Sequence, residues 1–186
     1  MTEQENLSEQ EILALAEQEG FTSAAVIPVE KLEFDPSLRK YCADNLCGNY
    51  GKNYSCPPFC GTPEEMKQRT EPYRRAWIFQ TIGEVGSWED TEKIKEVRDR
   101  HNQKSRSLIR RLRAGGREGL AMLAGPCSAC EVCAGFQDEP CRHPEEIPSC
   151  ISAYCMNAEK MAADAGLAYW CEEGKVAFFS LYLTRE

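Results

Sequence analysis

The sequence has no run of apolar residues long enough to cross a bilayer, which takes about 20 in succession. Residues 1–6 include no basic segment, apolar segment or small-residue cleavage site, so we expect a cytoplasmic protein. Internal repeats, low-complexity tracts and long linkers are also missing. Residues 1–186 are therefore predicted to form a single domain. The cysteines described below predict that this domain binds metal.

Recognisable catalytic motifs are absent as well. The sequence contains no glycine-rich phosphate loop, no dinucleotide fingerprint and no nucleophile with an evident base and orienting partner. We accordingly predict no catalytic residues and leave open whether the protein is an enzyme. The formal net charge of -8 argues against bulk attraction to nucleic acid or to anionic lipid. We expect neither among the partners.

Cysteine, in contrast, is abundant, with 11 residues. Eight of them form two dense groups at residues 42–60 and 127–141. The first cysteine group is Cys42, Cys47, Cys56 and Cys60, and the second cysteine group is Cys127, Cys130, Cys133 and Cys141. An iron-sulfur cluster or a tetrahedral zinc ion needs about four converging thiolates, and a reducing compartment keeps thiols free for metal. The spacing therefore predicts two metal-binding loops rather than a disulfide framework.

The second group has the more regular spacing. Cys127, Cys130 and Cys133 recur every three residues, the pattern by which bacterial ferredoxins bind a [4Fe-4S] cluster. Cys141 either completes the same cluster or serves the other one. A zinc site with four cysteine ligands is the alternative. His143 is close enough in sequence to donate a hydrogen bond to a cluster sulfide.

The first group is less regular. Four residues separate Cys42 from Cys47, as in plant-type ferredoxins, but eight more precede Cys56. Cys60 is either a fourth ligand or a small buried hydrophobic residue, and the second case would leave one iron open to water or substrate.

The remaining cysteines, Cys150, Cys155 and Cys171, are isolated in the sequence, and we expect them to be small buried side chains. His101 is expected to be a core histidine on a long helix. The same helix carries a basic stretch, which is a solvated face, a docking surface for an acidic partner or a source of positive charge that screens an anionic cluster. Its members are Arg98, Arg100, Lys104, Arg106, Arg110, Arg111 and Arg113.

Residue patterns predict an α/β or α+β fold with a sheet of about four strands and flanking helices. Strands are expected at 21–29, 76–82, 120–124 and 176–183, where β-branched and aromatic residues gather between turn signals. Helices are expected at 9–19 and 90–113, after Cys60, and between Asn157 and Gly166. The cysteine-rich loops fall at the strand ends or beside them.

Several sequence blocks resemble those of a known family. They run over residues 47–58 (CGNYGKNYSCPP) and 125–133 (GPCSACEVC), followed by 139–144 (EPCRHP) and Pro148-Ser149. They are similar to the prokaryotic family of predicted metal-binding proteins known as domain of unknown function 2284, over nearly the whole chain. This resemblance implies metal binding by the first three cysteines of the first group and by all four of the second. It names no reaction.

Our leading hypothesis is therefore an iron-sulfur protein with two [4Fe-4S] clusters that exchanges electrons with a redox partner protein in the cytoplasm of an anaerobe. A zinc-stabilised structural or interaction module is the first alternative. The second alternative is an enzyme with an open iron at the first site.

Overall fold

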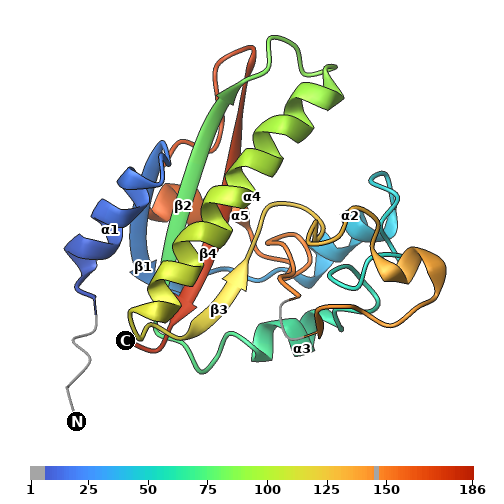
Figure 1. Cartoon of the computed structure of the whole chain (residues 1–186), viewed down its shortest axis with the longest axis horizontal. Helices are drawn as coiled ribbons and strands as arrows, with labels where there is room; N and C mark the ends of the chain where they lie inside the picture. Colours follow the sequence, from blue (N-terminus) through green and yellow to red (C-terminus); the bar gives the residue numbers. More distant parts are fainter. Residues whose placement is uncertain (1–6, 145–146) are drawn as a thin grey trace.

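The computed structural model describes residues 7–144 and 147–186 (Figure 1). The sequence-based interpretation of residues 1–6 as lacking an export signal lies outside the described residues. A four-stranded antiparallel sheet in the order β1-β2-β4-β3 forms the centre of the fold. Its strands are β1 (Ser23–Pro28), β2 (Arg75–Glu84), β3 (Gly119–Met122) and β4 (Lys175–Thr184). The antiparallel pairing makes this an α+β fold, one of the two predicted classes.

Helices α1 (Glu9–Gln18) and α4 (Thr91–Ala114) cover one face of the sheet. Alternate residues of β2 point to this face, where Trp77 and Phe79 are buried with Tyr182 of β4. Leu108 and Leu112 of α4 pack against them at helical spacing. No described helix is long and apolar enough to span a membrane.

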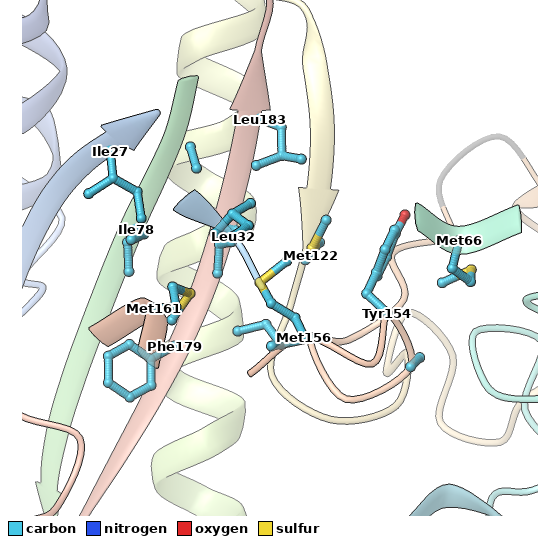
Figure 2. Packing of buried hydrophobic residues seen from close by; sticks show 14 of the residues in the cluster. Ile27, Leu32, Met66, Ile78, Met122, Tyr154, Met156, Met161, Phe179 and Leu183 are labelled. Atoms are coloured by element: carbon cyan, nitrogen blue, oxygen red, sulfur yellow. The ribbon is translucent and has the colours of Figure 1, made fainter. Parts of the chain in front are cut away.

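The opposite face carries a second hydrophobic core (Figure 2). Ile78 and Leu181 point to this side, and Met161 of the short helix α5 (Ala158–Asp164) packs against them. The core extends beyond the sheet to Met66 of α3 (Pro63–Gln68) and to Tyr154. The cysteine-rich segments are thus attached to the sheet by this second core.

The predicted elements are confirmed, and so are their start signals. Ser8 and Thr62 each accept a hydrogen bond from the backbone three residues on and form capping boxes with Glu11 and Glu65. Shorter elements complete the fold. They are α2 (Arg39–Ala43) and the 3-10 helices η1 (Val29–Lys31), η2 (Pro36–Leu38) and η3 (Ala134–Gln137).

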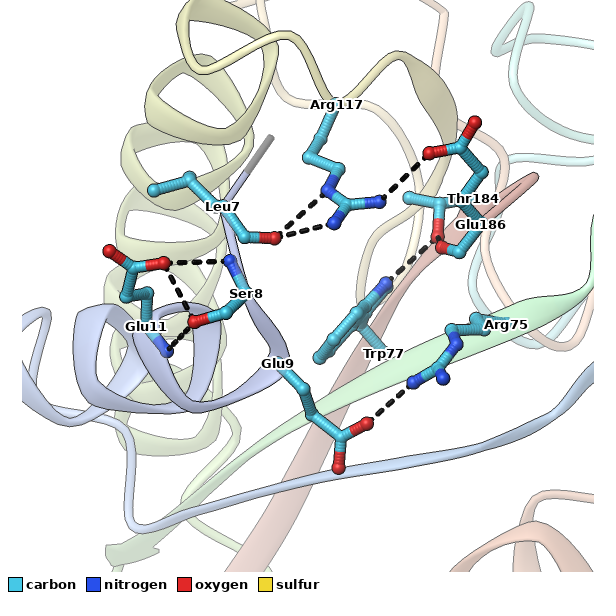
Figure 3. A network of polar contacts seen from close by, with 9 residues as sticks. All are labelled: Leu7, Ser8, Glu9, Glu11, Arg75, Trp77, Arg117, Thr184 and Glu186. Carbon is cyan, nitrogen blue, oxygen red and sulfur yellow. Dashed lines mark hydrogen bonds and ion pairs between the residues drawn. The ribbon is translucent and has the colours of Figure 1, made fainter. Parts of the chain in front are cut away.

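Polar contacts fix the two ends of the described chain to the sheet (Figure 3). Arg117 donates to the backbone oxygen of Leu7 and forms an ion pair with Glu186 at 3.6 Å. The buried Trp77 indole donates to Thr184 Oγ1 at 3.0 Å. Since these contacts join α1, β2 and β4, they stabilise the body on which the cysteine-rich segments are mounted.

His101 is a fully buried core residue, as expected from its place on the long helix. Its Nδ1 atom is 2.9 Å from Thr81 Oγ1, and Phe21 packs edge-on against the ring. Burial lowers the pKa of His101 to about 3, with the charge of Lys104 as a further cause. The imidazole is therefore neutral in the folded protein near neutral pH.

This burial predicts acid sensitivity. A histidine with an ordinary pKa of 6.5 takes up a proton in the unfolded chain, while folded His101 does not until about pH 3. Its contribution to stability is thus complete above pH 6.5 and is lost as the pH falls toward 3. We expect this histidine alone to lower the free energy of unfolding by about 1 kcal/mol between pH 7.5 and 5.5. Urea unfolding of the wild type and of His101→Gln at both pH values measures the difference, and equal pH dependence in the two proteins would contradict it.

Candidate metal centre

The two cysteine-rich segments lie side by side, outside the sheet and its helices. Figure 1 shows α2, α3 and the loops around them next to the segment that follows β3. The chain leaves β3 at Met122, and Leu123 forms a parallel bridge with Cys150. The second segment and the later part of the chain are thereby held next to the first segment.

Direct hydrogen bonds join the two segments. The Asn53 side chain donates to the Cys127 oxygen at 2.9 Å, and the Cys127 N–H donates to Ser55 Oγ at 2.8 Å. Tyr54 donates through its hydroxyl to the Glu139 oxygen at 2.7 Å. Gly135 passes so close that a Cβ atom there would lie 2.1 Å from the Lys52 oxygen. Glycine at this position therefore permits two backbones to meet.

Ser55 provides a test of how much this junction contributes to stability. It is fully buried, and its hydroxyl accepts from Cys127 and bonds to Asn53 Oδ1. Ser55→Ala leaves the Cys127 N–H without its partner, so we expect a loss of about 1–3 kcal/mol in the free energy of unfolding. Ser87→Ala, which removes a bond of 3.1 Å at an exposed turn, is the matched control and should cost less than about 0.5 kcal/mol. Similar losses in the free energy of unfolding in both variants would show that the junction stabilises the protein no more than an exposed turn does.

The second cysteine group lies around a common cavity. All four of its cysteines line one small cavity of about 20 Å³, including Cys141 from the far end of the loop. The His143 N–H donates to Cys141 Sγ at 3.4 Å, so hydrogen bonding to sulfur comes from the backbone of His143, while its side chain also lines the cavity. Arg106 of α4 approaches Cys127 Sγ to 4.0 Å. Sequence reasoning did not single out Arg106 for this contact.

The thiols of the first cysteine group are crowded and mostly shielded from water. Burial raises the pKa of the Cys56 thiol to about 12, although the Ser55 hydroxyl acts in the opposite direction. Burial also raises the pKa of Cys42 and Cys60, and Arg39 lowers both in part. Cys47 is exposed. Cys60 is 4% exposed and belongs to the second hydrophobic core.

Two of the three cysteines that are isolated in the sequence, Cys150 and Cys155, lie in this first region. The Cys150 thiol is the thiol with the largest influence on the pKa of both Cys42 and Cys56, and Cys155 also acts on Cys42. Burial raises the pKa of the Cys150 thiol itself. No sequence spacing connects these residues, because about 90 residues separate Cys150 from Cys56. Cys155 is buried as predicted, at 1% exposure.

Arg39 organises the same region and was missed by sequence reasoning. Its guanidinium donates to Cys155 Sγ at 3.5 Å, to the Gly61 oxygen at 3.0 Å and to the Ala153 oxygen at 2.9 Å. A cation among thiols stabilises thiolates. Only the position of Arg39 three residues before Cys42 hinted at this role. Cys171 lies elsewhere, in a cavity with Trp88 and Trp170.

Comparison with known protein families decides the assignment. A family model described as "Predicted metal-binding protein (DUF2284)" matches residues 25–184. The chain belongs to this family. Comparisons with curated proteins and with solved structures gave no significant match.

The donor set of this DUF2284 protein fits a metal that prefers sulfur. Thiolates select zinc, copper(I) and iron-sulfur clusters over hard cations. A cation bound at these groups would stabilise the thiolate forms that burial disfavours. As the described side chains are placed, no three cysteine, histidine, aspartate or glutamate residues converge closely enough to hold an ion. Metal binding therefore requires the thiols of each group to turn toward a common centre.

Proposed function

We propose that this protein binds two [4Fe-4S] clusters, one at each cysteine group, and exchanges single electrons with a redox partner protein in the cytoplasm of an anaerobe. The observation that carries the proposal is that all four cysteines of the second group line one cavity. Their three-residue spacing is that of ferredoxin cluster loops. Family membership independently supports metal binding.

At the second site, Cys127, Cys130, Cys133 and Cys141 would supply the ligands. The His143 N–H and the Arg106 guanidinium already lie within hydrogen-bonding range of two of these sulfurs. Donors to ligand sulfur stabilise the more negative, reduced state and so raise the reduction potential. A four-iron cluster bound there would supply a one-electron redox couple.

At the first site, Cys42, Cys47 and Cys56 would supply three ligands. Sequence spacing predicts Cys60 as the fourth ligand, but we infer that Cys150 is the fourth ligand. Besides burial, the Cys150 thiol raises the pKa of both Cys42 and Cys56, which indicates that the three thiols lie close together. Cys60 instead packs in the hydrophobic core, where its thiol lies 3.8 Å from the Gly61 oxygen. Under this assignment the iron is fully coordinated, which disfavours the open-iron enzyme.

The two sites are adjacent in the fold. The backbone of Cys127, a second-site ligand, is hydrogen bonded to Ser55, which neighbours the first-site ligand Cys56. Short separation favours electron exchange between the sites through the protein. The same junction would keep the separation constant, because Ser55 and Asn53 are both buried.

A zinc-stabilised structural module is the second candidate. The cavity of the second group, at about 20 Å³, has room for a single ion of about the size of a water molecule. A four-iron cluster would displace the thiols outward. Four cysteine ligands without an open position are also typical of structural zinc.

One experiment separates the two candidates. The protein is purified anaerobically, and iron, acid-labile sulfide and zinc are quantified in the same sample. Two four-iron clusters predict about eight iron and eight sulfide per chain and a brown, oxygen-sensitive protein. A colourless preparation with about two zinc ions and no sulfide would refute the iron-sulfur proposal and establish the structural one.

A further inference from the structure

A second type of site lies beside the metal centre, on the face of the basic helix. A cavity of about 300 Å³ opens between the C-terminal half of α4, strand β3 and the segment at residues 147–148. We term it the arginine cavity, because Arg106, Arg110 and Arg113 line it together. These residues are spaced by four and three positions, so they project from one face of the helix.

The cavity arginines, like the exposed Arg100 of the same helix, have no counter-ion among the described residues, whereas three other nearby arginines do. Arg98, Arg111 and Arg117 form ion pairs with Asp99, Glu19 and Glu186. Within residues 7–144 and 147–186, no acidic side chain pairs with the three cavity arginines.

Arg113 adds a second sign that a ligand is missing. Its guanidinium lies beside the Tyr182 hydroxyl, yet its Nε atom is buried and has no hydrogen-bond partner among the described residues. A buried donor without a partner is costly. An oxyanion bound between the guanidinium groups would offset the repulsion among three like charges.

The rest of the lining is apolar. Ile109, Leu120, Leu123 and Pro148 are among the residues that line the cavity. A volume of about 300 Å³ is at the small end of the range for small-molecule sites. Mixed charged and apolar walls of this size favour a small amphipathic ligand over an extended acidic peptide, which would need a longer groove.

We propose that the arginine cavity binds a small organic anion. Its carboxylate or phosphate group contacts Arg106, Arg110 and Arg113, and its apolar part packs against Ile109, Leu120 and Leu123. This inference does not rest on the identity of the metal. It gives the basic stretch of α4 a specific role in place of a merely solvated face.

The cavity is also connected to the second cysteine group. Arg106 lines the arginine cavity and a neighbouring cavity with His143, and its guanidinium is 4.0 Å from Cys127 Sγ. An oxyanion and the Cys127 sulfur therefore share one cation. For this reason Arg106 is a poor choice for a test of anion binding alone, and Arg110 is the better one.

The test uses calorimetric titration of the full-length, metal-containing protein at low salt. Phenyl phosphate and benzoate are the probes, and benzyl alcohol is the uncharged control. We expect saturable binding of one anion per chain and no binding of the alcohol. Arg110→Gln should weaken the binding at least about tenfold, because it removes a charge-assisted hydrogen bond. Arg100→Gln removes the same charge from an exposed position of α4 outside the cavity and should change the affinity less than about twofold.

Several results would overturn the proposal. One is the absence of saturable binding, and another is an equal loss of affinity in the two variants. Binding of inorganic phosphate as tight as that of phenyl phosphate would also overturn it, because the apolar wall would then be unused. Tighter binding of tetraglutamate would assign the surface to an acidic protein partner instead. Glu145 and Glu146 precede the lining residue Ile147 and lie outside the described residues, so the double variant to glutamine is included. An affinity increase of tenfold in that variant would mean that the chain neutralises its own arginines, and the proposal would fail.

Discussion

Cys130→Ser is expected to remove the metal of the second cysteine group while the first group keeps its own. Cys130 is the middle residue of the three-residue repeat and lines the cavity with the other three thiols. Serine is nearly isosteric but is a much poorer ligand for soft metals. If each group binds one four-iron cluster, the variant should retain about half of the iron and half of the sulfide. Metal analysis after anaerobic purification measures both.

Cys171→Ser is the matched control for this substitution. Cys171 is partly exposed, and it lines a separate cavity between Trp88 and Trp170. Its replacement should leave the metal content unchanged. If Cys130→Ser kept its full complement of iron, the second group would not be a four-thiolate site. If it lost all of its iron and still folded, the two sites would depend on each other through the Ser55–Cys127 junction.

The fold was largely predictable because its signals are local. The capping boxes at Ser8 and Thr62 mark helix starts through contacts that span three residues. The strand at 76–82 is marked by its own aromatic and β-branched residues, and it forms the interior of β2. The strand order β1-β2-β4-β3 was not predicted, because it depends on pairings between residues about 100 positions apart.

The candidate site was likewise predictable only where its signals are local in the sequence. Regular spacing singled out Cys127, Cys130 and Cys133 and left open whether Cys141 belongs with them, whereas the structure places all four around one cavity. The approach of Cys150 to Cys42 depends on the bridge from Leu123 to Cys150 and on the core around Tyr154. Arg39 reaches Cys155 across 116 positions of sequence. Local sequence patterns do not predict either contact, because each joins residues that are far apart in the sequence.

The first cysteine group provides the sharpest remaining comparison, between Cys60 and Cys150. We expect Cys150→Ala to remove the metal of the first group, again about half of the total, since its thiol lies among Cys42 and Cys56. Cys60→Ala should keep the metal and lower only the free energy of unfolding, by about 1 kcal/mol, because it shortens a side chain in the hydrophobic core. Metal analysis and urea unfolding of both variants separate the two roles.

The reverse result would be equally informative. Loss of metal in Cys60→Ala, with full metal in Cys150→Ala, would restore the ligand set that sequence spacing favours, Cys42, Cys47, Cys56 and Cys60. Retention of metal in both single variants, with loss in the double variant, would mean that either thiol can complete the site. Arg39 affects the two thiols differently. It lowers the pKa of Cys60, and its guanidinium contacts Cys155 rather than Cys150. A thiolate at Cys60 therefore already has a cation partner, whereas a thiolate at Cys150 has only backbone hydrogen bonds, chiefly from Ala153 and Ser152, to oppose the effect of burial, and a bound metal would supply the positive charge.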